Sequence, residues 1–415
     1  MKIHIIGSGI IGLFTAYYLV KEGHEVYIIE QSDGKNGCSF ENAGMIVPSH
    51  FIPLAAPGMV KKGFKWMFDN SSPFYVKPRF NCDFFSWAYR FNQSATKQNV
   101  EKASPILKEV LLYSQTLYQQ IKDVELDFET KGLLMLCQKE NTLKEEIEVA
   151  HKAHDMGMKA DILDRDGVHL LEPNSKTNVC GGVFYPDDTH CNPQVLFQNL
   201  KTFLLNNKVT FKYNSKVTAA TINNGKVDSL KIENEDESIK IEHLVLAAGS
   251  WSGELAKTLG LHIPMEAGKG YSFTQQQVFK NEIRHPSLLC EAKVAVTPFL
   301  NNAVRFAGTM ELSGINQHVN LKRVMAITES GRRFYPENDI KMPAANDIWL
   351  GLRPCSPDGL PYIGRDKKMK NVVLATGHAM LGISMAAATG KLVAEILQEE
   401  KPSIDLELFG ANRFD

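Results

Sequence analysis

The sequence predicts an α/β protein with a Rossmann-like dinucleotide-binding part and a second, α+β part built on a mixed β-sheet. Three observations support this fold class: a strand, a glycine-rich turn and a helix open the chain, strand-like segments fill its middle, and strand–helix alternation returns at its end. A chain of 415 residues is long for one domain, so two intertwined domains are expected.

The first elements form a βαβ unit. Ile3–Ile6 is a β-branched run that leads into GSGIIG, and the helix-permissive segment IGLFTAYYLVKEG follows it and stops at Gly23. A second strand, EVYIIE, ends at Glu30. Because a helix joins these two strands, we expect them to lie parallel in one sheet.

Helical and strand patterns alternate in the middle of the chain. Helices are expected at roughly Val100–Asp123 and Leu143–Met156, the second closed by Gly157. The segment NNGK is a hairpin signal. Around it we expect four strand-like segments, Val209–Tyr213, Lys216–Ile222, Lys226–Glu233 and Ser238–Gly249, which form a meander that leads into a buried apolar strand, His243–Ala247.

The last third begins with a second strand-rich stretch, which covers about residues 268–311. Asp347–Leu352 then reads as a strand that ends before Arg353, because prolines at positions 354, 357 and 361 predict rigid loop backbone. The chain closes on the strand NVVLATG and the helix LGISMAAATGKLVAEILQ.

The composition excludes several classes of protein. A formal net charge of −1 provides no basic surface, so no nucleic-acid partner is expected. The seven cysteines show no CxxC or CxxxH spacing, which disfavours zinc and iron–sulfur sites, and no metal is expected. Reduced thiols suit a cytoplasmic protein. The first residues are already a strand without a charged leader or apolar segment, which argues against a secretion signal, and no apolar run reaches the roughly 18 residues of a membrane span.

The turn after the first strand carries a dinucleotide fingerprint. Gly7-x-Gly9-x-x-Gly12 follows a strand and opens a helix, and Glu30 ends the next strand. Gly7 permits the tight turn, Gly9 lets the backbone approach a pyrophosphate, and Gly12 lets the helix pack on the strand. Glu30 can accept hydrogen bonds from ribose hydroxyls and would repel a 2′-phosphate, which disfavours NADP.

Three later features favour FAD over NAD. GCSFENAGMI follows the second strand closely, LVLAAGSW ends a buried strand in a turn of small residues, and LATGHAMLGISMA places another helix N-terminus near the end of the chain. A helix N-terminus aimed at the pyrimidine end of a flavin would stabilise negative charge there.

The chain resembles the D-amino acid oxidase superfamily of FAD enzymes, and within it the bacterial D-amino acid dehydrogenases. The matching stretches are NAGMIVPSHFIPLAAPGMVKKGFKWMF, GKGYSF, GLRPCSPDGLPYIGR and TGHAMLGISMAAATGK, and the resemblance extends from Gly7 to about Leu397. It implies a Rossmann-like FAD-binding domain from residues 1–79, 154–257 and 348–415, with a substrate-binding domain from residues 80–153 and 258–347.

Motifs and resemblance together assign a set of residues to the cofactor, which we expect to be non-covalent FAD, since the match of Cys355 to a tethering family is poor. The set is Gly7, Gly9, Ile10, Ile11, Gly12, Glu30, Gln31, Ser39, Asn42, Ala43, Gly44, Met45, Val217, Ala248, Gly249, Trp251, Gly377, His378, Leu381, Gly382, Ile383 and Ser384.

The resemblance implies that Arg353, in GLRP, pairs with the substrate carboxylate. A planar guanidinium suits that role, and the alternative is a salt bridge to Asp358. Relatives often add a tyrosine to this clamp. The comparable segment here, residues 293–299, has none, so Tyr271 is the candidate, with a core aromatic as its alternative. His378 and His50 are further candidates for the catalytic site, each with a structural or surface role as its alternative.

The expected reaction is oxidative deamination of a D-amino acid. Hydride passes from the substrate Cα to flavin N5, and the resulting imine hydrolyses to a 2-oxo acid. A D-proline or cis-4-hydroxy-D-proline dehydrogenase, an oxygen-using oxidase of the glycine or sarcosine type, and a non-catalytic redox sensor remain alternatives.

The expected electron acceptor is a quinone or another respiratory acceptor at the membrane surface. Gly58–Phe68 interleaves lysines with large apolar residues, so it could dock on an anionic bilayer or pack on its own domain. We expect a cytoplasmic protein with peripheral attachment to the inner face of the cell membrane, and the sequence leaves open an oligomer.

Overall fold

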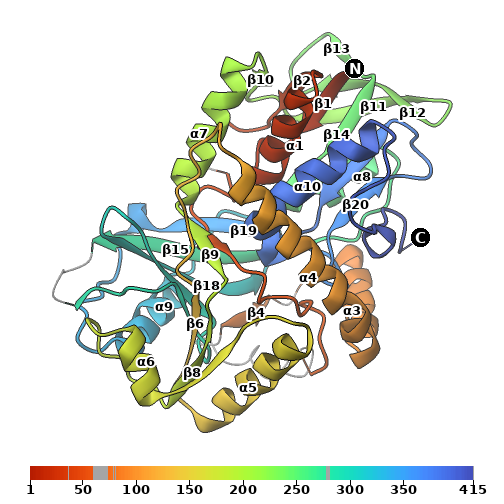
Figure 1. The fold of residues 1–415 in the computed structure, drawn as a ribbon. Coiled ribbons are helices and arrows are strands. Elements are labelled where there is room, and N and C mark those ends of the chain that lie inside the picture. Colours follow the sequence, from red (N-terminus) through yellow and green to blue (C-terminus); the bar gives the residue numbers. More distant parts are fainter. Residues whose placement is uncertain (36, 59–72, 78, 80, 277–280, 415) are drawn as a thin grey trace.

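The structure, a computed structural model, describes residues 1–35, 37–58, 73–77, 79, 81–276 and 281–414 (Figure 1). The Gly58–Phe68 segment therefore lies, apart from Gly58, outside the described residues.

The N-terminal βαβ unit lies in a six-stranded sheet, which also contains strands from the middle and the end of the chain, in the order β10-β2-β1-β14-β21-β20. Its first five strands are parallel and β20 is antiparallel to β21. The bounds are β1 Lys2–Ile6, β2 Glu25–Ile29, β10 Thr210–Lys212, β14 His243–Leu246, β20 Tyr362–Arg365 and β21 Val372–Thr376. The predicted parallel βαβ unit and the Rossmann-like fold class are confirmed, because β1 pairs with β2 on one side and with the distant β14 on the other.

Four helices surround this sheet in the upper half of Figure 1. They are α1 Ile10–Lys21, α4 Lys97–Gln120, α7 Pro193–Asn206 and α10 Gly382–Leu397. α1 and α10 are apolar on nearly every side because each is covered by neighbours on nearly every side. The span Ala379–Leu397 is long and apolar enough to cross a membrane, but 72% of it is buried among the other helices, so core packing explains its composition.

The expected meander is only partly correct. β11 Val217–Asn223, β12 Lys226–Ile232 and β13 Ser238–Lys240 form an antiparallel sheet, and Asn224 and Gly225 make the expected two-residue hairpin turn with φ of 50° and 70°. The flanking segments, β10 and β14, instead enter the parallel sheet. Their partners β2 and β1 lie far away in the sequence, so local spacing could not reveal the pairing.

A large mixed sheet occupies the lower half of Figure 1, in the order β19-β15-β18-β17-β16-β6-β8-β7, with β4 also paired to β18. Its bounds are β4 Phe74–Val76, β6 Leu133–Cys137, β7 Asp161–Asp164, β8 Gly181–Tyr185, β15 Glu266–Gln276, β16 Ser287–Leu289, β17 Val294–Pro298, β18 Ala303–Leu312 and β19 Trp349–Cys355. α9 Leu321–Phe334 packs on one face, while α5 Glu140–Asp155 and α6 Arg165–Leu171 pack near β6 to β8.

The expectation that a strand ends before Arg353 is wrong. β19 continues through Arg353 and Pro354 to Cys355, in antiparallel register with Glu266–Ser272 of β15. Pro354 is tolerated because β19 is an edge strand of this sheet, where a missing N–H costs no ladder hydrogen bond. β4, β7, β8 and β19 all join the large sheet, although their residues fall in ranges expected for the FAD-binding domain.

Shorter elements connect the two large sheets. β3 Met45–Ile46, β9 Thr189–Cys191 and β5 Phe128–Glu129 form a small sheet between them. The remaining elements are α3 Cys82–Ser94, α8 Ser252–Thr258, and the 3₁₀ turns η1 Gly249–Trp251, η3 Ala345–Asp347, η4 Ala379–Leu381 and η5 Glu407–Phe409.

We expect Gly390→Ala to destabilise the protein. Gly390 lies where α10 crosses α1, and a Cβ there would sit 2.5 Å from the Phe14 carbonyl oxygen, so two helix backbones would have to separate. Overpacking of this kind costs about 1–3 kcal/mol, to be measured by urea unfolding. Gly382→Ala is the control in the same helix, because its Cβ would meet nothing closer than 3.9 Å. Equal stability of the two variants would contradict the packing argument.

Candidate active site

Two long helices begin at the same edge of the parallel sheet. α1 starts at Ile10 directly after β1, and α10 starts at Gly382 shortly after β21, while β14 lies between these two strands. Neither helix has a side-chain cap at its N-terminus. The carboxyl edge of a parallel sheet with uncapped helix N-termini is suited to anionic groups, because free N–H groups and the helix dipole both favour negative charge.

The glycine fingerprint has the shape that its spacing predicts. A Cβ on Gly7 would lie 2.4 Å from the Ala247 carbonyl oxygen, and one on Gly12 would lie 2.0 Å from the Gly7 carbonyl oxygen, so both positions are closed by backbone. A Cβ on Gly9 would meet only the Ser39 hydroxyl at 3.6 Å, which leaves this side open. This is where the backbone of such a turn approaches a pyrophosphate.

The first turn of α1 keeps donors free. The Ile10 N–H donates to Ser39 Oγ at 3.1 Å, whereas the Ile11 and Gly12 N–H groups have no hydrogen-bond partner among the described residues. Ile10, Ile11, Gly12 and Ser39 were all expected at the cofactor, and the fold brings them together.

Glu30 is held at the end of β2 by two serines. One carboxylate oxygen accepts from the Ser8 N–H and hydroxyl, both at 2.9 Å, and the other accepts from the Ser32 N–H at 2.9 Å and hydroxyl at 2.8 Å. The Ser215 N–H donates to the Glu30 carbonyl at 2.8 Å, which brings the start of β11, and with it Val217, beside this end. The neighbouring Gln31 is exposed.

The Asn42–Gly44 turn is fixed by its own asparagine. Asn42 Oδ1 accepts from the Gly44 N–H at 2.7 Å, and its Nδ2 donates to the Ser39 carbonyl at 2.9 Å. Arg305 of β18, a buried residue, donates from Nη1 to the Asn42 carbonyl at 2.9 Å. The sheet that carries Arg353 therefore also holds this turn.

Two further bonds place Ala43 and Met45 between the sheets. The Thr297 hydroxyl of β17 donates to the Ala43 carbonyl at 2.7 Å, and the Ser384 hydroxyl in the first turn of α10 donates to the Met45 carbonyl at 2.9 Å. Sequence reasoning missed Thr297 and Arg305, because no local pattern distinguishes them from other strand residues.

The second and third glycine-containing turns lie against each other. The Thr376 hydroxyl, at the end of β21, donates to the Gly249 carbonyl at 3.2 Å. Gly249 and Gly377 have φ of 54° and 82°, conformations that favour glycine. The expected cofactor residues Ala248, Gly249, Trp251, Gly377, Leu381, Gly382 and Ile383 belong to these two turns and to the helix starts that follow them.

His378 is buried and turned into the protein. Its Nε2 lies 2.9 Å from Thr389 Oγ1 in α10, and its backbone bridges to Cys355. Burial lowers the pKa of His378 to about 3, so the ring is neutral. The ring links the β21 turn to α10, which makes the structural alternative for this residue the better supported one.

Arg353 is the charged residue at the other side of this junction. Burial lowers the pKa of its guanidinium, and its Nη1 donates to the Thr309 carbonyl at 2.8 Å. Among the described residues no carboxylate pairs with it. Asp358, the expected alternative partner, is instead held by Arg413, with Nε–Oδ2 at 2.7 Å and Nη2–Oδ1 at 3.0 Å. The salt-bridge alternative for Arg353 is therefore contradicted.

Two details of the neighbouring strands make room for the guanidinium. A Cβ on Gly270 would lie 2.1 Å from Arg353 Nη1, so only glycine fits in β15 at this point. Thr309 has φ of 65°, where the β15–β18 register shifts, and its carbonyl faces Arg353. A β-branched residue is strained in this conformation. The alternating glycines of GKG in β15 were the available sequence signal for such a close approach.

Tyr271 does not meet Arg353. Gly270 faces the guanidinium, so the next residue of the strand points to the opposite face of the sheet, where Tyr271 packs in the α9 core. Its hydroxyl lies 3.2 Å from Glu311 Oε2 and accepts from the Asn320 N–H at 3.2 Å. The geometry does not support a carboxylate clamp shared by Tyr271 and Arg353.

His50 lies in the loop after β3. Its Nδ1 is 3.1 Å from the Ser49 hydroxyl, which in turn bonds to Asp188. Burial, assisted by the charge of Lys293, lowers the pKa of His50 to about 4, so this ring is also neutral.

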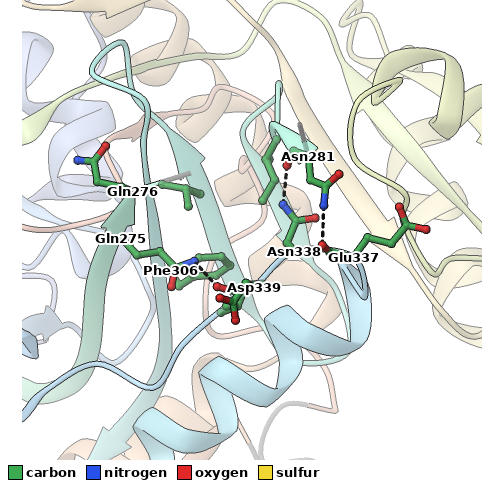
Figure 2. Close-up of a pocket in the computed structure, with 10 residues that line it drawn as sticks. Gln275, Gln276, Asn281, Phe306, Glu337, Asn338 and Asp339 are labelled. Carbon is green, nitrogen blue, oxygen red and sulfur yellow. Dashed lines mark hydrogen bonds between the residues drawn. The ribbon is translucent and has the colours of Figure 1, made fainter. Parts of the chain in front are cut away.

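A separate cavity of about 200 Å³ lies at the far end of β15 (Figure 2). Gln275 and Asn338 line it, and hydrogen bonds from Gln275 to the Asp339 carbonyl and from Asn338 to the Asn281 carbonyl tie the loop after α9 to the strand end. Gln275 is seven residues beyond Gly268, the register partner of Arg353, or roughly 23 Å along a strand. This cavity is therefore not part of the candidate site.

Comparisons with known proteins agree with this geometry. The family profile described as "FAD dependent oxidoreductase" (DAO) matches residues 2–396. The D-amino acid dehydrogenase of Helicobacter pylori is 31% identical over 414 residues, covering 99% of this chain and 98% of the relative. That of Granulibacter bethesdensis is 29% identical over 413 residues, covering 98% and 97%.

Solved structures share the fold at lower identity. Glycine oxidase from Geobacillus kaustophilus superposes with a TM-score of 0.77 at 19% identity, over 100% of this chain and 98% of that one. L-proline dehydrogenase from P. horikoshii gives 0.77 at 18% identity, over 100% and 97%. The family profile, the full-length relatives and the uncapped helix starts at the sheet edge agree, and the chain belongs to the DAO family of FAD-dependent oxidoreductases.

Proposed function

We propose that this chain is a D-amino acid dehydrogenase that passes its electrons to a quinone or another respiratory acceptor. The observation that carries the proposal is Arg353, a desolvated guanidinium without a carboxylate partner among the described residues. The full-length relatives with this printed name support the choice of substrate class.

Arg353 would bind the substrate carboxylate. Among the described residues only one of its N–H groups has a partner, the Thr309 carbonyl, so the rest of the fork remains for a bidentate pair with an anion. The edge strand β19 fixes the backbone at this point, and Gly270 leaves space for the planar group. A carboxylate gripped in this way fixes the orientation of the Cα–H and of the amine.

The cofactor residues fit FAD. The free N–H groups of α1 would hold the pyrophosphate, Glu30 would hold the ribose, and the N-terminus of α10 would face the pyrimidine edge. FAD, when bound, supplies the acceptor for the substrate hydride. The chain would act by orienting the substrate and by keeping its amine neutral, so that the nitrogen lone pair supports departure of the hydride.

Localisation and assembly remain proposals as well. A cytoplasmic enzyme, attached to the inner face of the membrane, would match a respiratory acceptor, and the Gly58–Phe68 segment is the sequence feature that favours it. An oligomer is compatible with this proposal.

Substrate class is tested by an anaerobic bleaching screen. The screen contains D-Ala, D-Pro, cis-4-hydroxy-D-proline, glycine and sarcosine. We expect at least one of the three D-amino acids to bleach the yellow protein, and the colour to return slowly in air. Fast re-oxidation by air would identify an oxidase instead, and no bleaching with any of the five would contradict catalysis on these amines.

Acid precipitation is expected to release the flavin into the supernatant. Cys355 is the candidate for a tether, but burial raises the pKa of its thiol to about 12, and its Sγ donates to the Arg353 carbonyl at 3.4 Å. A protonated, buried thiol is a poor nucleophile. Yellow colour retained in the pellet would show that FAD is covalent.

Replacing Glu30 by Ala is expected to weaken FAD binding while the protein still folds. Lost charge-assisted hydrogen bonds cost about 1.5–3 kcal/mol, or roughly one to two decades in the dissociation constant. Isothermal titration of the apoprotein with FAD measures this change. Glu25→Ala, on the same strand but exposed, is the control, and an unchanged constant in Glu30→Ala would remove Glu30 from the site.

Arg353→Leu is expected to bind FAD normally and to lose about two to four decades in kcat/KM, since an unpaired buried carboxylate costs roughly 3–5 kcal/mol. Arg353→Lys should recover only part of this loss, because an ammonium cannot form the bidentate pair. An amine without a carboxylate should keep its already poor rate in both variants. Equal losses on both kinds of substrate would mean that Arg353 shapes the protein and does not bind the carboxylate.

A further inference from the structure

Three polar groups between the two sheets are hydrogen-bonded in series. Ser49 Oγ donates to Asp188 Oδ2 at 2.5 Å, and it lies 3.1 Å from His50 Nδ1. The Ser49 hydroxyl has one proton, which it donates to Asp188, so its oxygen can only accept from His50. His50 therefore carries its proton on Nδ1, and its Nε2 is an acceptor. The Ser49 N–H also donates to Asp188 Oδ1 at 3.2 Å, so the carboxylate is held by both atoms of one residue.

The carboxylate end of this series opens on a small cavity. Asp188 and Ser49 are 2% and 5% exposed, so the bonds between them are shielded from water. Asp188 nevertheless lines a cavity of about 120 Å³, together with Lys108, Lys159 and Asp187. With these four charged side chains in its lining, the cavity can hold water molecules, which gives a proton at Asp188 a route outward.

The imidazole end lies on the loop that joins the two parts of the candidate site. At the start of this loop the Val47 N–H bonds to Ser384 in the first turn of α10, at 3.2 Å. At its end, the Leu54 side chain packs in the cluster that contains Cys355, two residues beyond Arg353. His50 sits between these points. The residue is half-buried, and its Nε2 has no hydrogen-bond partner among the described residues.

We propose that His50, Ser49 and Asp188 form a proton relay that takes the proton lost by the substrate ammonium group and delivers it to the cavity beyond Asp188. This inference rests on the proposed function. The N–H bond of the ammonium breaks and its proton joins His50 Nε2, the Nδ1 proton moves to Ser49, and the Ser49 proton moves to the Asp188 carboxylate. No electrons change hands, and the amine keeps the lone pair that it needs for hydride departure.

The charges around the relay suit this role. Burial, with a smaller contribution from the charge of Asp187, raises the pKa of Asp188 to about 7, although the two bonds from Ser49 lower it. Lys159, which pairs with Asp187 at 3.3 Å, and Lys108 face the same cavity. Burial, and after it the charge of Lys293, lowers the pKa of His50 and keeps the ring neutral. A carboxylate that titrates near neutrality can both take and release a proton at working pH.

The sign of the pH dependence follows from these groups. Below about pH 7, Asp188 is protonated and cannot accept, so flavin reduction should slow as the pH falls through this value. Above it the relay is active. At strongly alkaline pH the free substrate amine is already neutral, and the relay is no longer needed.

Anaerobic stopped-flow measurement of flavin reduction across pH tests the relay. We expect Asp188→Asn and Ser49→Ala to bind FAD, to lose about 100-fold in the limiting rate at pH 7, to lose the inflection near that pH, and to recover at alkaline pH. Ser49→Thr keeps the hydroxyl and should restore most of the rate. Asp187→Asn, in the same cavity but outside the series, is the matched control. It should keep the wild-type limiting rate above the inflection and move the inflection only to lower pH, because the charge of Asp187 raises the pKa of Asp188.

A binding measurement gives a second readout that does not need turnover. α-Aminoisobutyrate has no Cα–H to lose, so calorimetry in buffers of different ionisation enthalpy reports the protons released as it binds. Above pH 7 the wild type should release a proton that Asp188→Asn does not release. If an amino acid bleaches the wild type, and Asp188→Asn and Ser49→Ala match its rate and pH profile, the relay is wrong and the proposed function stands. If no amino acid bleaches the wild type, the proposed function is wrong and the relay fails with it.

Discussion

A guanidinium removed from water requires an anion, and Arg353 has none of its own among the described residues. Burial of the charge lowers the pKa of Arg353, and the single bond to the Thr309 carbonyl replaces only part of the lost hydration. A site of this kind gains most from a carboxylate that arrives with the substrate, because the cost of desolvation has already been met during folding. The strained Thr309 and the side-chain-free Gly270 are understood as the local conditions that allow the charge to stay there.

A residue near the C-terminus, Arg413, binds the loop that follows Arg353. Arg413 holds Asp358, the acid nearest to Arg353 in the sequence, by a bidentate pair, and it also donates to the Leu360 carbonyl at 2.7 Å. Its guanidinium lies 4.0 Å from the centre of the Tyr362 ring. One arginine near the end of the chain therefore fixes the loop after β19 and pairs with Asp358, the acid nearest to Arg353 in the sequence.

The segment between the two sheets is held through its backbone carbonyls. Arg305 and Thr297 of the large sheet and Ser384 of α10 bind three carbonyls of residues 42–45 in turn. The position of this short segment is thus set from both sides, by the large sheet and by α10. Rigid support from regular elements is what keeps such a constellation in register for hydride transfer.

The sequence by itself determined the parallel βαβ unit, the glycine turn with Glu30 and the hairpin at Asn224, because each depends on residues that are close in the chain or on backbone that only glycine permits. The tertiary structure decided the rest. Strand pairing placed β10 and β14 in the parallel sheet and carried β19 through Pro354 at a sheet edge, since the partner strands β2, β1 and β15 lie far away in the sequence. Strand alternation turned Tyr271 away from Arg353, and Asp358 pairs with Arg413. These outcomes depend on which side chains meet across the fold, which local patterns do not encode.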